Sequence, residues 1–369
     1  MSEPGDHGHM ARALELARHG LYSTPPNPSV GCVLVGDGRV VGEGFHRQAG
    51  GPHAEVVALA AAGANARGAT AYVSLEPCAH FGRTPPCTDA LLAAGIARVA
   101  CALRDPNPRV DGAGLAVLAR GGVAVESGLL AAESAELNRG FVRRMQSGRP
   151  WVTLKIAASL DGRTALADGS SRWITGEAAR ADVQRLRARA AAIVTGIGTV
   201  LADDPALTVR DPALELAGRR PLRVVLDSQL RIPATAQVLD AAAPTLVFAA
   251  VAAEAGAGAL KARGARVEAL PGRGGVLDLA ALLERLGALE CNEIVVEAGP
   301  TLAGGFLDAG LVDELVLYVA PCVLGDAARP MFALPRLERM AERRNFVLSE
   351  TCQIGGDLRL RLRPAEAAR

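Results

Sequence analysis

The sequence has few aromatic side chains and almost no net charge. Phe, Trp and Tyr together make up 3% of its 369 residues, and 40 basic residues stand against 39 acidic ones. Proteins that bind single-stranded nucleic acid use rows of aromatic platforms, and proteins that bind a phosphate backbone use a basic surface. We therefore expect no nucleic-acid partner and take a small molecule as the expected ligand.

Long apolar runs are missing as well. No stretch reaches the roughly 20 apolar residues of a membrane helix, and the first ten residues, MSEPGDHGHM, lack the basic and apolar parts of a secretion signal. We expect no membrane association and a cytoplasmic location. The seven cysteines are an odd number at irregular positions. This argues against a disulfide framework and leaves thiols available as metal ligands.

Length and apolar content predict two domains, because 369 residues exceed what one core usually organises. Gly148-Arg149-Pro150 interrupts the chain, so we place the domains at residues 1–147 and 148–369. Short apolar strands alternate with helical segments in both, which predicts two α/β domains. In the first, we expect helices at 10–19, 54–62 and 88–94 and strands at 31–35, 40–45, 69–75 and 99–103.

In the second domain, the apolar runs predict strands at 151–159, 193–194, 222–226, 245–249 and 293–297. The later segments 314–321 and 323–324 and the closing alternation LRLRLR (358–363) are expected to add strands, antiparallel at one edge.

A metal-ligating pattern lies in the first domain, which holds all six histidines. His53-Ala54-Glu55 opens an alanine-rich helix, and Cys78 and Cys87 follow. One imidazole and two thiolates give zinc three protein ligands and leave a fourth position for water, whereas structural zinc sites usually have four protein ligands. Glu55 can move protons between that water and a base. The pattern predicts a zinc deaminase, with His53 and Cys78 at the starts of two successive helices.

The plain alternative is a helix-capping histidine with two ordinary buried cysteines. We favour the zinc site over this alternative, because four chemically suitable groups follow one another in the expected order. His46 stays open between a substrate contact and a structural role. The remaining cysteines lack partner motifs and are assigned to packing: Cys32, Cys101, Cys291, Cys322 and Cys352.

The spacing of the two cysteines departs from the general deaminase signature. Two residues normally separate them, whereas eight, AHFGRTPP, do so here. One glycine and two prolines make this insert a shaped turn that can return the second thiolate to the metal. His80 and Arg83 in the insert suit an anionic group of the substrate.

Several motifs in order resemble the bifunctional riboflavin-biosynthesis deaminase-reductases, whose pattern includes the insert. The first half carries TPPNPSVG (24–31), PHAE (52–55), LEPCAHFGRTPPC (75–87) and DPNPRVDGAG (105–114). The second half carries KIAASLDGRTA (155–165), SRWIT (171–175), GIGTVLADDPALTVR (196–210) and VEAGPTLAGGFL (296–307). The resemblance implies a cytidine-deaminase-like three-layer α/β/α domain followed by a dihydrofolate-reductase-like α/β domain.

The resemblance also implies two reactions and a homo-oligomer. The first is hydrolytic deamination of 2,5-diamino-6-ribosylamino-4(3H)-pyrimidinone 5′-phosphate. The second is reduction by NADPH of the ribosyl group of 5-amino-6-(5-phosphoribosylamino)uracil to ribityl. Zn²⁺ and NADPH are the implied cofactors.

Residue by residue, the resemblance implies three further sets of contacts. The deaminase substrate would contact Asn27 and His80. NADPH would contact Ala157, Trp173, Thr199, Asp203, Ser228, Gly299, Pro300, Thr301, Leu302, Ala303, Gly304 and Gly305. The reductase substrate would contact Ser171, Arg187, Leu207, Arg210 and Glu297, with the arginine forks suited to a phosphate.

Chemistry alone leaves parts of the second domain open. VEAGPTLAGGFL predicts a strand, a small-residue turn and a helix whose N-terminus could bind phosphate, but glycine after a strand is also an ordinary turn, and no GxGxxG fingerprint is present. Asp227 at a strand end would indicate NAD by Rossmann logic. Arg187 could equally lie on a solvated helix face. The proton for reduction could come from a carboxyl group, Lys155, water or the substrate.

Two other functions are consistent with parts of the pattern. The first is a zinc deaminase of another base or nucleotide with a non-catalytic C-terminal domain. The second is a nucleotide-sensing module with a structural zinc, which the count of three ligands opposes.

Overall fold

The computed structural model describes residues 5–82, 84–108, 110–250 and 254–365. The chain divides into two compact units, one of Met1–Gly148 with Glu215–Gly218 and one of Arg149–Leu214 with Arg219–Arg369. Arg83, which the sequence suggested as an anion contact, lies outside the described residues. In the described part of the chain, no helix combines the length and apolar character needed to cross a membrane.

The first unit is built on a five-stranded sheet in the order β2-β1-β3-β4-β5. β1 is antiparallel to β2 and β3, and β3, β4 and β5 are parallel. The strands are β1 (Gly31–Gly36), β2 (Arg39–Phe45), β3 (Thr70–Val73), β4 (Arg98–Cys101) and β5 (Ala124–Ser127). The helices are α1 (Asp6–Arg18), α2 (Ala54–Ala62), α3 (Cys87–Ala94), α4 (Ala113–Arg120), α5 (Ala131–Leu137) and α6 (Arg139–Ser147), with a 3-10 turn at Gly63–Ala66.

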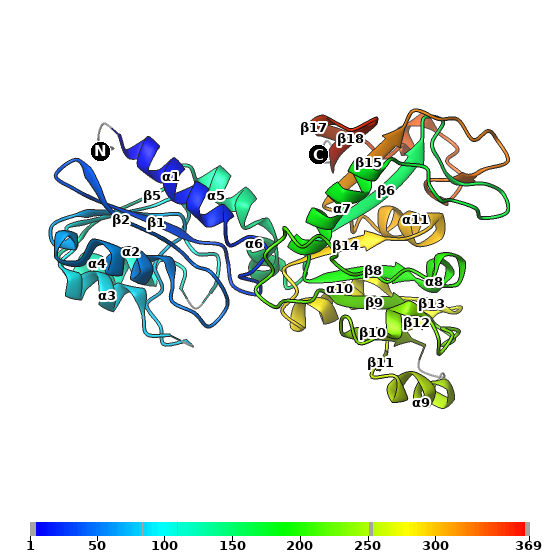
Figure 1. Cartoon of the computed structure of the whole chain (residues 1–369), viewed down its shortest axis with the longest axis horizontal. Coiled ribbons are helices and arrows are strands. Elements are labelled where there is room, and N and C mark those ends of the chain that lie inside the picture. The colour runs from blue at the N-terminus through cyan, green and yellow to red at the C-terminus, as the bar shows by residue number, and fades with distance from the viewer. Residues whose placement is uncertain (1–4, 83, 109, 251–253, 366–369) are drawn as a thin grey trace. The chain divides into compact units, whose positions relative to one another are not determined.

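Alternating strand residues give this sheet two apolar faces. Cys32 and Leu34 pack with residues of α2, α3 and α4, whereas Val33 packs with residues of α1. Figure 1 shows α1 and α5 on one side of the sheet and α2, α3 and α4 on the other. The first unit is therefore the three-layer α/β/α arrangement, because a strand period of two buries both faces.

The second unit contains a nine-stranded sheet in the order β11-β10-β9-β8-β14-β6-β15-β18-β17. Its strands are β6 (Trp151–Ser159), β8 (Ala192–Gly196), β9 (Leu222–Leu226), β10 (Thr245–Ala249), β11 (Arg266–Ala269), β14 (Glu293–Glu297), β15 (Glu314–Ala320), β17 (Phe346–Ile354) and β18 (Asp357–Pro364). Two short pairs join β7 (Arg163–Ala165) to β16 (Arg329–Pro330) and β12 (Gly272–Arg273) to β13 (Val276–Leu277).

Helices cover both faces of the second sheet. Residues of α10 (Leu279–Ala288) and α11 (Pro300–Asp308) form one core with β6, while α7 (Glu177–Arg189), α8 (Ile197–Asp203) and α9 (Glu254–Ala262) contribute to the other. Short 3-10 turns lie at Gln237–Leu239 and Met340–Glu342. The strands from β11 to β15 run parallel, so their carboxyl ends share one edge.

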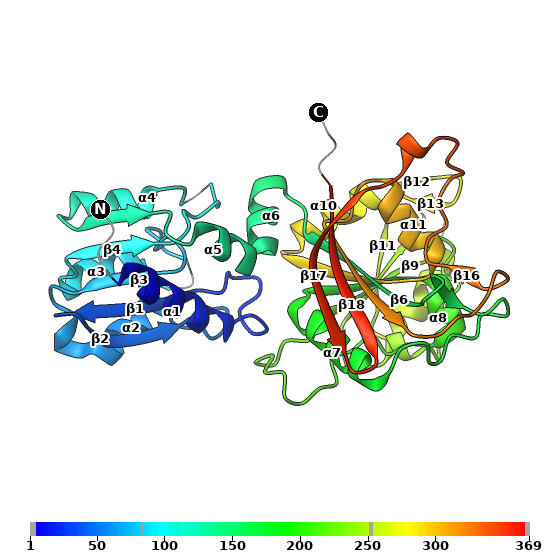
Figure 2. The ribbon, with the colours of Figure 1, turned by 90° about the horizontal axis from the view of Figure 1, so that it is seen from above.

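One strand prediction in the second half was wrong. Val323-Leu324 forms no strand, because the N–H groups of Leu324 and Gly325 donate to the carboxylate of Asp161 instead of to a neighbouring strand. The predicted antiparallel edge is confirmed, because β15 pairs parallel to β6 on one side and antiparallel to β18 on the other. β18 in turn pairs antiparallel with β17, and Figure 2 shows these two strands side by side.

Candidate active sites

Three elements of the first unit position the predicted zinc ligands. His53 is the N-cap of α2, Cys87 is the first residue of α3, and Cys78 lies in the loop after β3. The prediction that Cys78 begins a helix was wrong, because the glycine and prolines of the insert delay the helix until Cys87. Gly44 on β2 lets α2 approach closely, since a Cβ there would lie 2.6 Å from the Ala54 carbonyl oxygen.

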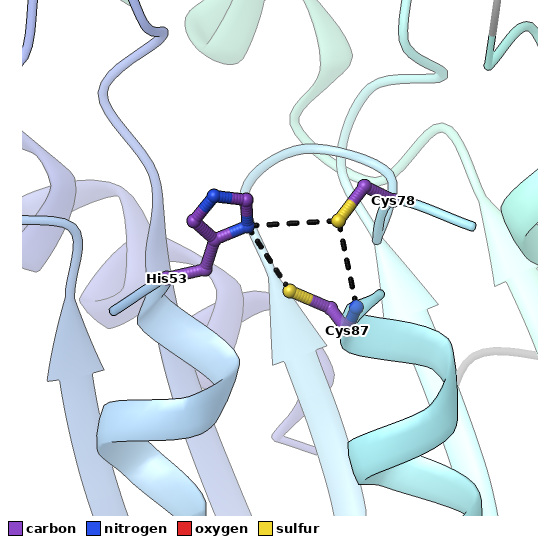
Figure 3. Close-up of side chains that lie close together, drawn as sticks. All are labelled: His53, Cys78 and Cys87. Carbon is purple, nitrogen blue, oxygen red and sulfur yellow. Dashed lines mark hydrogen bonds between the residues drawn. The ribbon is translucent and has the colours of Figure 1, made fainter. Parts of the chain in front are cut away.

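The three ligand atoms converge on one point. His53 Nδ1 lies 3.2 Å from Cys87 Sγ and 3.6 Å from Cys78 Sγ, and Figure 3 shows the ring nitrogen directed between the two sulfurs. All three atoms lie within 4.8 Å of one another. Zinc bonds of about 2.0 to 2.3 Å at tetrahedral angles would put such ligands roughly 3.5 to 3.8 Å apart. The residues therefore fit zinc.

The electrostatics of this cluster suit proton transfer beside a metal. A hydrogen bond from the Cys87 side chain, together with one from His53, lowers the pKa of the Cys78 thiol to about 4, which favours the thiolate that binds metal. Burial raises the pKa of Glu55, which lies in the first turn of α2. A raised pKa makes this carboxyl group a better proton carrier, because its protonated form is easier to populate.

Asn27 and His46 form a second part of the site. Asn27 Nδ2 lies 3.0 Å from His46 Nε2, and His46 Nδ1 lies 3.0 Å from the Pro52 carbonyl oxygen. Because that carbonyl only accepts, Nδ1 carries the proton, and Nε2 accepts from the Asn27 amide. His46 is 2% exposed, and its ring meets that of His53 edge-on at 5.2 Å. His80, by contrast, is exposed on the insert.

Glu76 is a buried polar residue close in sequence to the metal cluster, and no role was predicted for it from the sequence. Its buried carboxylate accepts hydrogen bonds from the backbone N–H groups of Asp105, Gly112, Gly114 and Leu115. It thereby caps the N-terminus of α4 from a position two residues before Cys78. An acidic residue inside the mainly apolar run VSLEP was the signal available in the sequence.

In the second unit, the predicted cofactor residues follow neighbouring parallel strands. Thr199 lies on α8, directly after β8, Ser228 follows β9, and Gly299 follows β14. These strands are adjacent in the order β9-β8-β14-β6, and Ala157 lies on β6. The set therefore gathers at the carboxyl edge, where ligands bind in open α/β sheets.

The segment from Gly299 to Gly305 is a helix N-terminus more than a loop. Gly299 is the N-cap of α11 and provides no side-chain cap, and a Cβ there would meet no atom of the described residues within 4 Å. Pro300, Thr301 and Leu302 form the first turn. Ala303 is buried, and a Cβ on Gly304 would lie 2.2 Å from the Ala333 carbonyl oxygen. Packing therefore explains the small residue at 304, while the uncapped turn at 299–301 fits a phosphate.

The charged residues predicted for the substrate form a compact group. Arg187 Nε and Nη2 donate to Glu297 at 2.6 and 3.0 Å, and Arg187 Nη1 donates to the Thr208 carbonyl. The solvated-face alternative for Arg187 is wrong, because this residue is 9% exposed. Burial alone would raise the pKa of Glu297, but the nearby cations Arg187, Lys155 and Arg210 lower it to about 2.

The remaining predicted residues have separate surroundings. Ser171 Oγ donates to Asp203 Oδ1 at 3.4 Å, which links a predicted substrate contact to a predicted cofactor contact. Trp173 is 69% exposed, and the guanidinium groups of Arg172 and Arg180 lie 5.7 and 4.5 Å from its ring centroid. The side chain of Leu207 is buried in the core, so only its backbone is available to a ligand.

Asp227 cannot select NAD in the manner of a Rossmann fold. Its side chain is fully buried, one oxygen accepts from the Ile232 N–H at 2.9 Å, and the other lies 3.7 Å from Arg231 Nε. The carboxylate is thus not presented to a ribose hydroxyl. The position of Asp227 at a strand end is therefore no argument for NAD.

Comparison with known proteins identifies relatives of both halves. Residues 4–103 match the family model described as the cytidine and deoxycytidylate deaminase zinc-binding region, and residues 150–360 match the RibD C-terminal domain. The riboflavin biosynthesis protein RibD of Escherichia coli is 50% identical over 97% of this chain and 99% of its own length. That of Haemophilus influenzae is 47% identical over 96% of each chain.

Solved structures agree over both units. RibD of Acinetobacter baumannii is 46% identical with a TM-score of 0.91, covering 98% of this chain and 99% of its own. A diaminohydroxyphosphoribosylaminopyrimidine deaminase/5-amino-6-(5-phosphoribosylamino)uracil reductase from Thermotoga maritima is 33% identical with a TM-score of 0.86 at the same coverage. The predicted fold class, a cytidine-deaminase-like domain followed by a dihydrofolate-reductase-like domain, is confirmed.

Proposed function

The chain belongs to the RibD family of bifunctional riboflavin biosynthesis proteins, and from this premise we propose which of its residues perform the two reactions. It is an enzyme with deaminase and reductase activities that uses zinc and NADPH. We assign residues 1–147 to deamination of 2,5-diamino-6-ribosylamino-4(3H)-pyrimidinone 5′-phosphate. We assign residues 148–369 to reduction of 5-amino-6-(5-phosphoribosylamino)uracil. The convergence of His53, Cys78 and Cys87 is the observation that carries this proposal.

In the first reaction, water replaces a ring amino group, which leaves as ammonia. His53, Cys78 and Cys87 would hold zinc, which supplies Lewis acidity. Glu55 accepts a proton from the attacking water at its carboxylate and delivers it to the leaving amino group; its raised pKa suits both steps. Asn27, oriented by His46, contacts the ring or ribose, and His80 on the insert reaches the phosphate.

In the second reaction, NADPH supplies a hydride to C1′ of the opened ribosyl group. Three cations, Arg187, Lys155 and Arg210, act electrostatically on the single carboxylate of Glu297. The resulting excess of positive charge attracts the ribose phosphate. The fork of Arg187 is already occupied by Glu297, so Arg210 is the arginine we assign to the phosphate. Ser171 and the backbone of Leu207 complete the substrate contacts.

A proton must accompany the hydride to form the ribitylamino product. Lys155 pairs with Glu297 across β6 and β14, and burial lowers the pKa of its ammonium group. A lysine with a lowered pKa gives up its proton more readily. We therefore assign the proton to Lys155, one of the sources left open by the sequence.

The alternative of a deaminase with a non-catalytic second domain is not favoured. The family match extends over residues 150–360, and an uncapped helix N-terminus and a group of buried charges lie in that unit.

We also propose a homo-oligomer in the cytoplasm. Light scattering of the purified chain tests the assembly, and a monomer at working concentration would contradict it.

The test replaces Glu55 with Gln in the full chain. We expect ammonia release to fall about 10²- to 10⁴-fold, with stoichiometric zinc retained. Oxidation of NADPH should persist when the deaminated substrate is supplied. Glu133→Gln, on an exposed position of α5, is the matched control and should keep both activities. Wild-type protein without stoichiometric zinc, or unchanged ammonia release in Glu55→Gln, would contradict the deaminase assignment.

A further inference from the structure

The imidazole of His53 has hydrogen-bonding partners at both ring nitrogens. Nδ1 faces the sulfurs of Cys87 and Cys78 at 3.2 and 3.6 Å, and Nε2 lies 3.3 Å from the hydroxyl oxygen of Thr84. The two nitrogens therefore have different tasks. Nδ1 belongs to the metal cluster, and Nε2 points to a neutral side chain outside it.

A metal-binding histidine uses an unprotonated nitrogen, so its proton lies on the other nitrogen. With Nδ1 directed at the metal position, Nε2 carries the proton and donates it to Thr84 Oγ1. Such a hydrogen bond fixes both the tautomer and the rotation of the ring. In the described residues, Thr84 Oγ1 is the partner found at Nε2.

Thr84 comes from the eight-residue insert that separates Cys78 from Cys87. Its carbonyl accepts from the Gly82 N–H at 3.2 Å, and Pro85 and Pro86 link it to the start of α3. The restricted φ of the prolines limits how far the hydroxyl can move relative to Cys87. A cysteine pair separated by only two residues lacks the segment that carries this side chain.

We propose that Thr84 is a positioning residue that holds His53 in the metal-binding tautomer, so that the insert supports the metal centre. This inference rests on the proposed zinc site. It assigns the insert a task at the metal in addition to any contact with the substrate. Loss of the Thr84 hydroxyl should therefore be seen in zinc retention even without substrate.

The experiment compares Thr84→Val with Thr84→Ser in the full-length protein loaded with zinc. Val keeps the β-branched shape without the hydroxyl, and Ser keeps the hydroxyl. Transfer of zinc to a chromophoric chelator is followed at pH 7.5. We expect zinc affinity to fall about 10- to 100-fold in Thr84→Val, and to be restored by Thr84→Ser to within about threefold of wild type.

Thr88→Val is the matched control. Thr88 lies beside Cys87, and its buried hydroxyl has no hydrogen-bond partner among the described residues, so its loss should leave zinc affinity unchanged. Wild-type affinity in Thr84→Val, or equal losses in Thr84→Val and Thr84→Ser, would overturn the inference while leaving the proposed function intact. A wild-type protein that holds no zinc would instead contradict the proposed function itself.

Discussion

Arg187 and Glu297 form a two-bonded ion pair, with Nε–Oε1 at 2.6 Å and Nη2–Oε2 at 3.0 Å, although 110 positions separate them in the chain. Their side chains are 10% and 11% exposed. Lys155 lies on the strand next to Glu297 and adds a second cation. Loss of Glu297 would therefore leave the buried guanidinium group of Arg187 without its anion.

The ion pair predicts how stability depends on pH. The pKa of Glu297 is about 2 in the folded chain, below its ordinary value near 4.3, so the stabilisation is present above pH 4.3 and is lost as pH falls to 2. We expect Glu297→Gln to lower the free energy of unfolding by about 3 kcal/mol at pH 7, with a shrinking difference below pH 4. Both tryptophans, Trp151 and Trp173, belong to the second unit, so their fluorescence in urea follows it selectively.

The exposed Glu284 on α10 provides the control for this measurement. Glu284→Gln should change the unfolding free energy by less than about 0.5 kcal/mol. A difference between wild type and Glu297→Gln that stays constant from pH 7 to pH 3 would contradict the assigned charge state.

Two glycines of α11 separate cofactor binding from packing. In the part of the chain that the structure describes, a methyl group at Gly299 meets nothing within 4 Å, and its φ of −72° is ordinary, so Gly299→Ala should fold normally. If phosphate binds at this uncapped end, the NADPH dissociation constant should rise about tenfold, or about 1.4 kcal/mol. Gly304→Ala should instead destabilise the unit by about 1 to 3 kcal/mol, because its methyl group meets the Ala333 carbonyl.

Calorimetric titration with NADPH in the absence of substrate measures the first effect, and tryptophan fluorescence in urea measures the second. An unchanged dissociation constant in Gly299→Ala would show that the dinucleotide phosphates bind elsewhere.

The orientation of the Asn27 amide gives a third prediction. Its Nδ2 donates to His46 Nε2, so its oxygen is the group that remains to accept a hydrogen bond from the substrate in the proposed site. In Asn27→Asp the carboxylate has no N–H for His46, and in Asn27→Ala the acceptor of His46 is left unpaired. We expect KM for ammonia release to rise about tenfold or more in both variants, with zinc retained. Asn65→Ala, at an exposed position, is the control; an unchanged KM in Asn27→Asp would remove Asn27 from the substrate contacts.

Much of the fold could be predicted from local apolar patterns. The segments 54–62, 151–159, 222–226, 245–249 and 293–297 have the same bounds in the sequence analysis and in the structure. The failures concern partners that are distant in sequence. Nothing local indicated that Asp161 would take the N–H groups of Leu324 and Gly325, which removes them from a sheet.

In the candidate sites, too, the residues set by local sequence were predictable and those set by distant partners were not. The metal cluster was predictable because zinc requires particular ligand types. His53, Cys78 and Cys87 supply these types, and they follow one another along the chain in the order typical of zinc deaminases. The burial of Arg187 was not predictable, since on its helix alone it could equally face solvent; Glu297 on β14 decides its orientation. The role of Glu76 was hidden because its four donors belong to a loop and helix about 30 to 40 residues further along the chain.

The carboxylate of Glu76 ties the loop before Cys78 to the start of α4. Its two oxygens accept four backbone N–H groups, two of them from the first turn of α4, and a Cβ on Gly114 would lie 1.9 Å from the Pro77 carbonyl oxygen. The amide of Glu76→Gln has only one oxygen, so its nitrogen would face N–H groups that need an acceptor. We expect the first unit to lose about 2 to 3 kcal/mol of stability. Its unfolding transition, followed by circular dichroism, should move to a lower urea concentration, whereas the transition of the second unit, followed by tryptophan fluorescence, should not move. Because Cys78 follows two residues later, zinc should also be lost faster than in Glu133→Gln, and equal rates in the two variants would show that Glu76 supports α4 without supporting the metal loop.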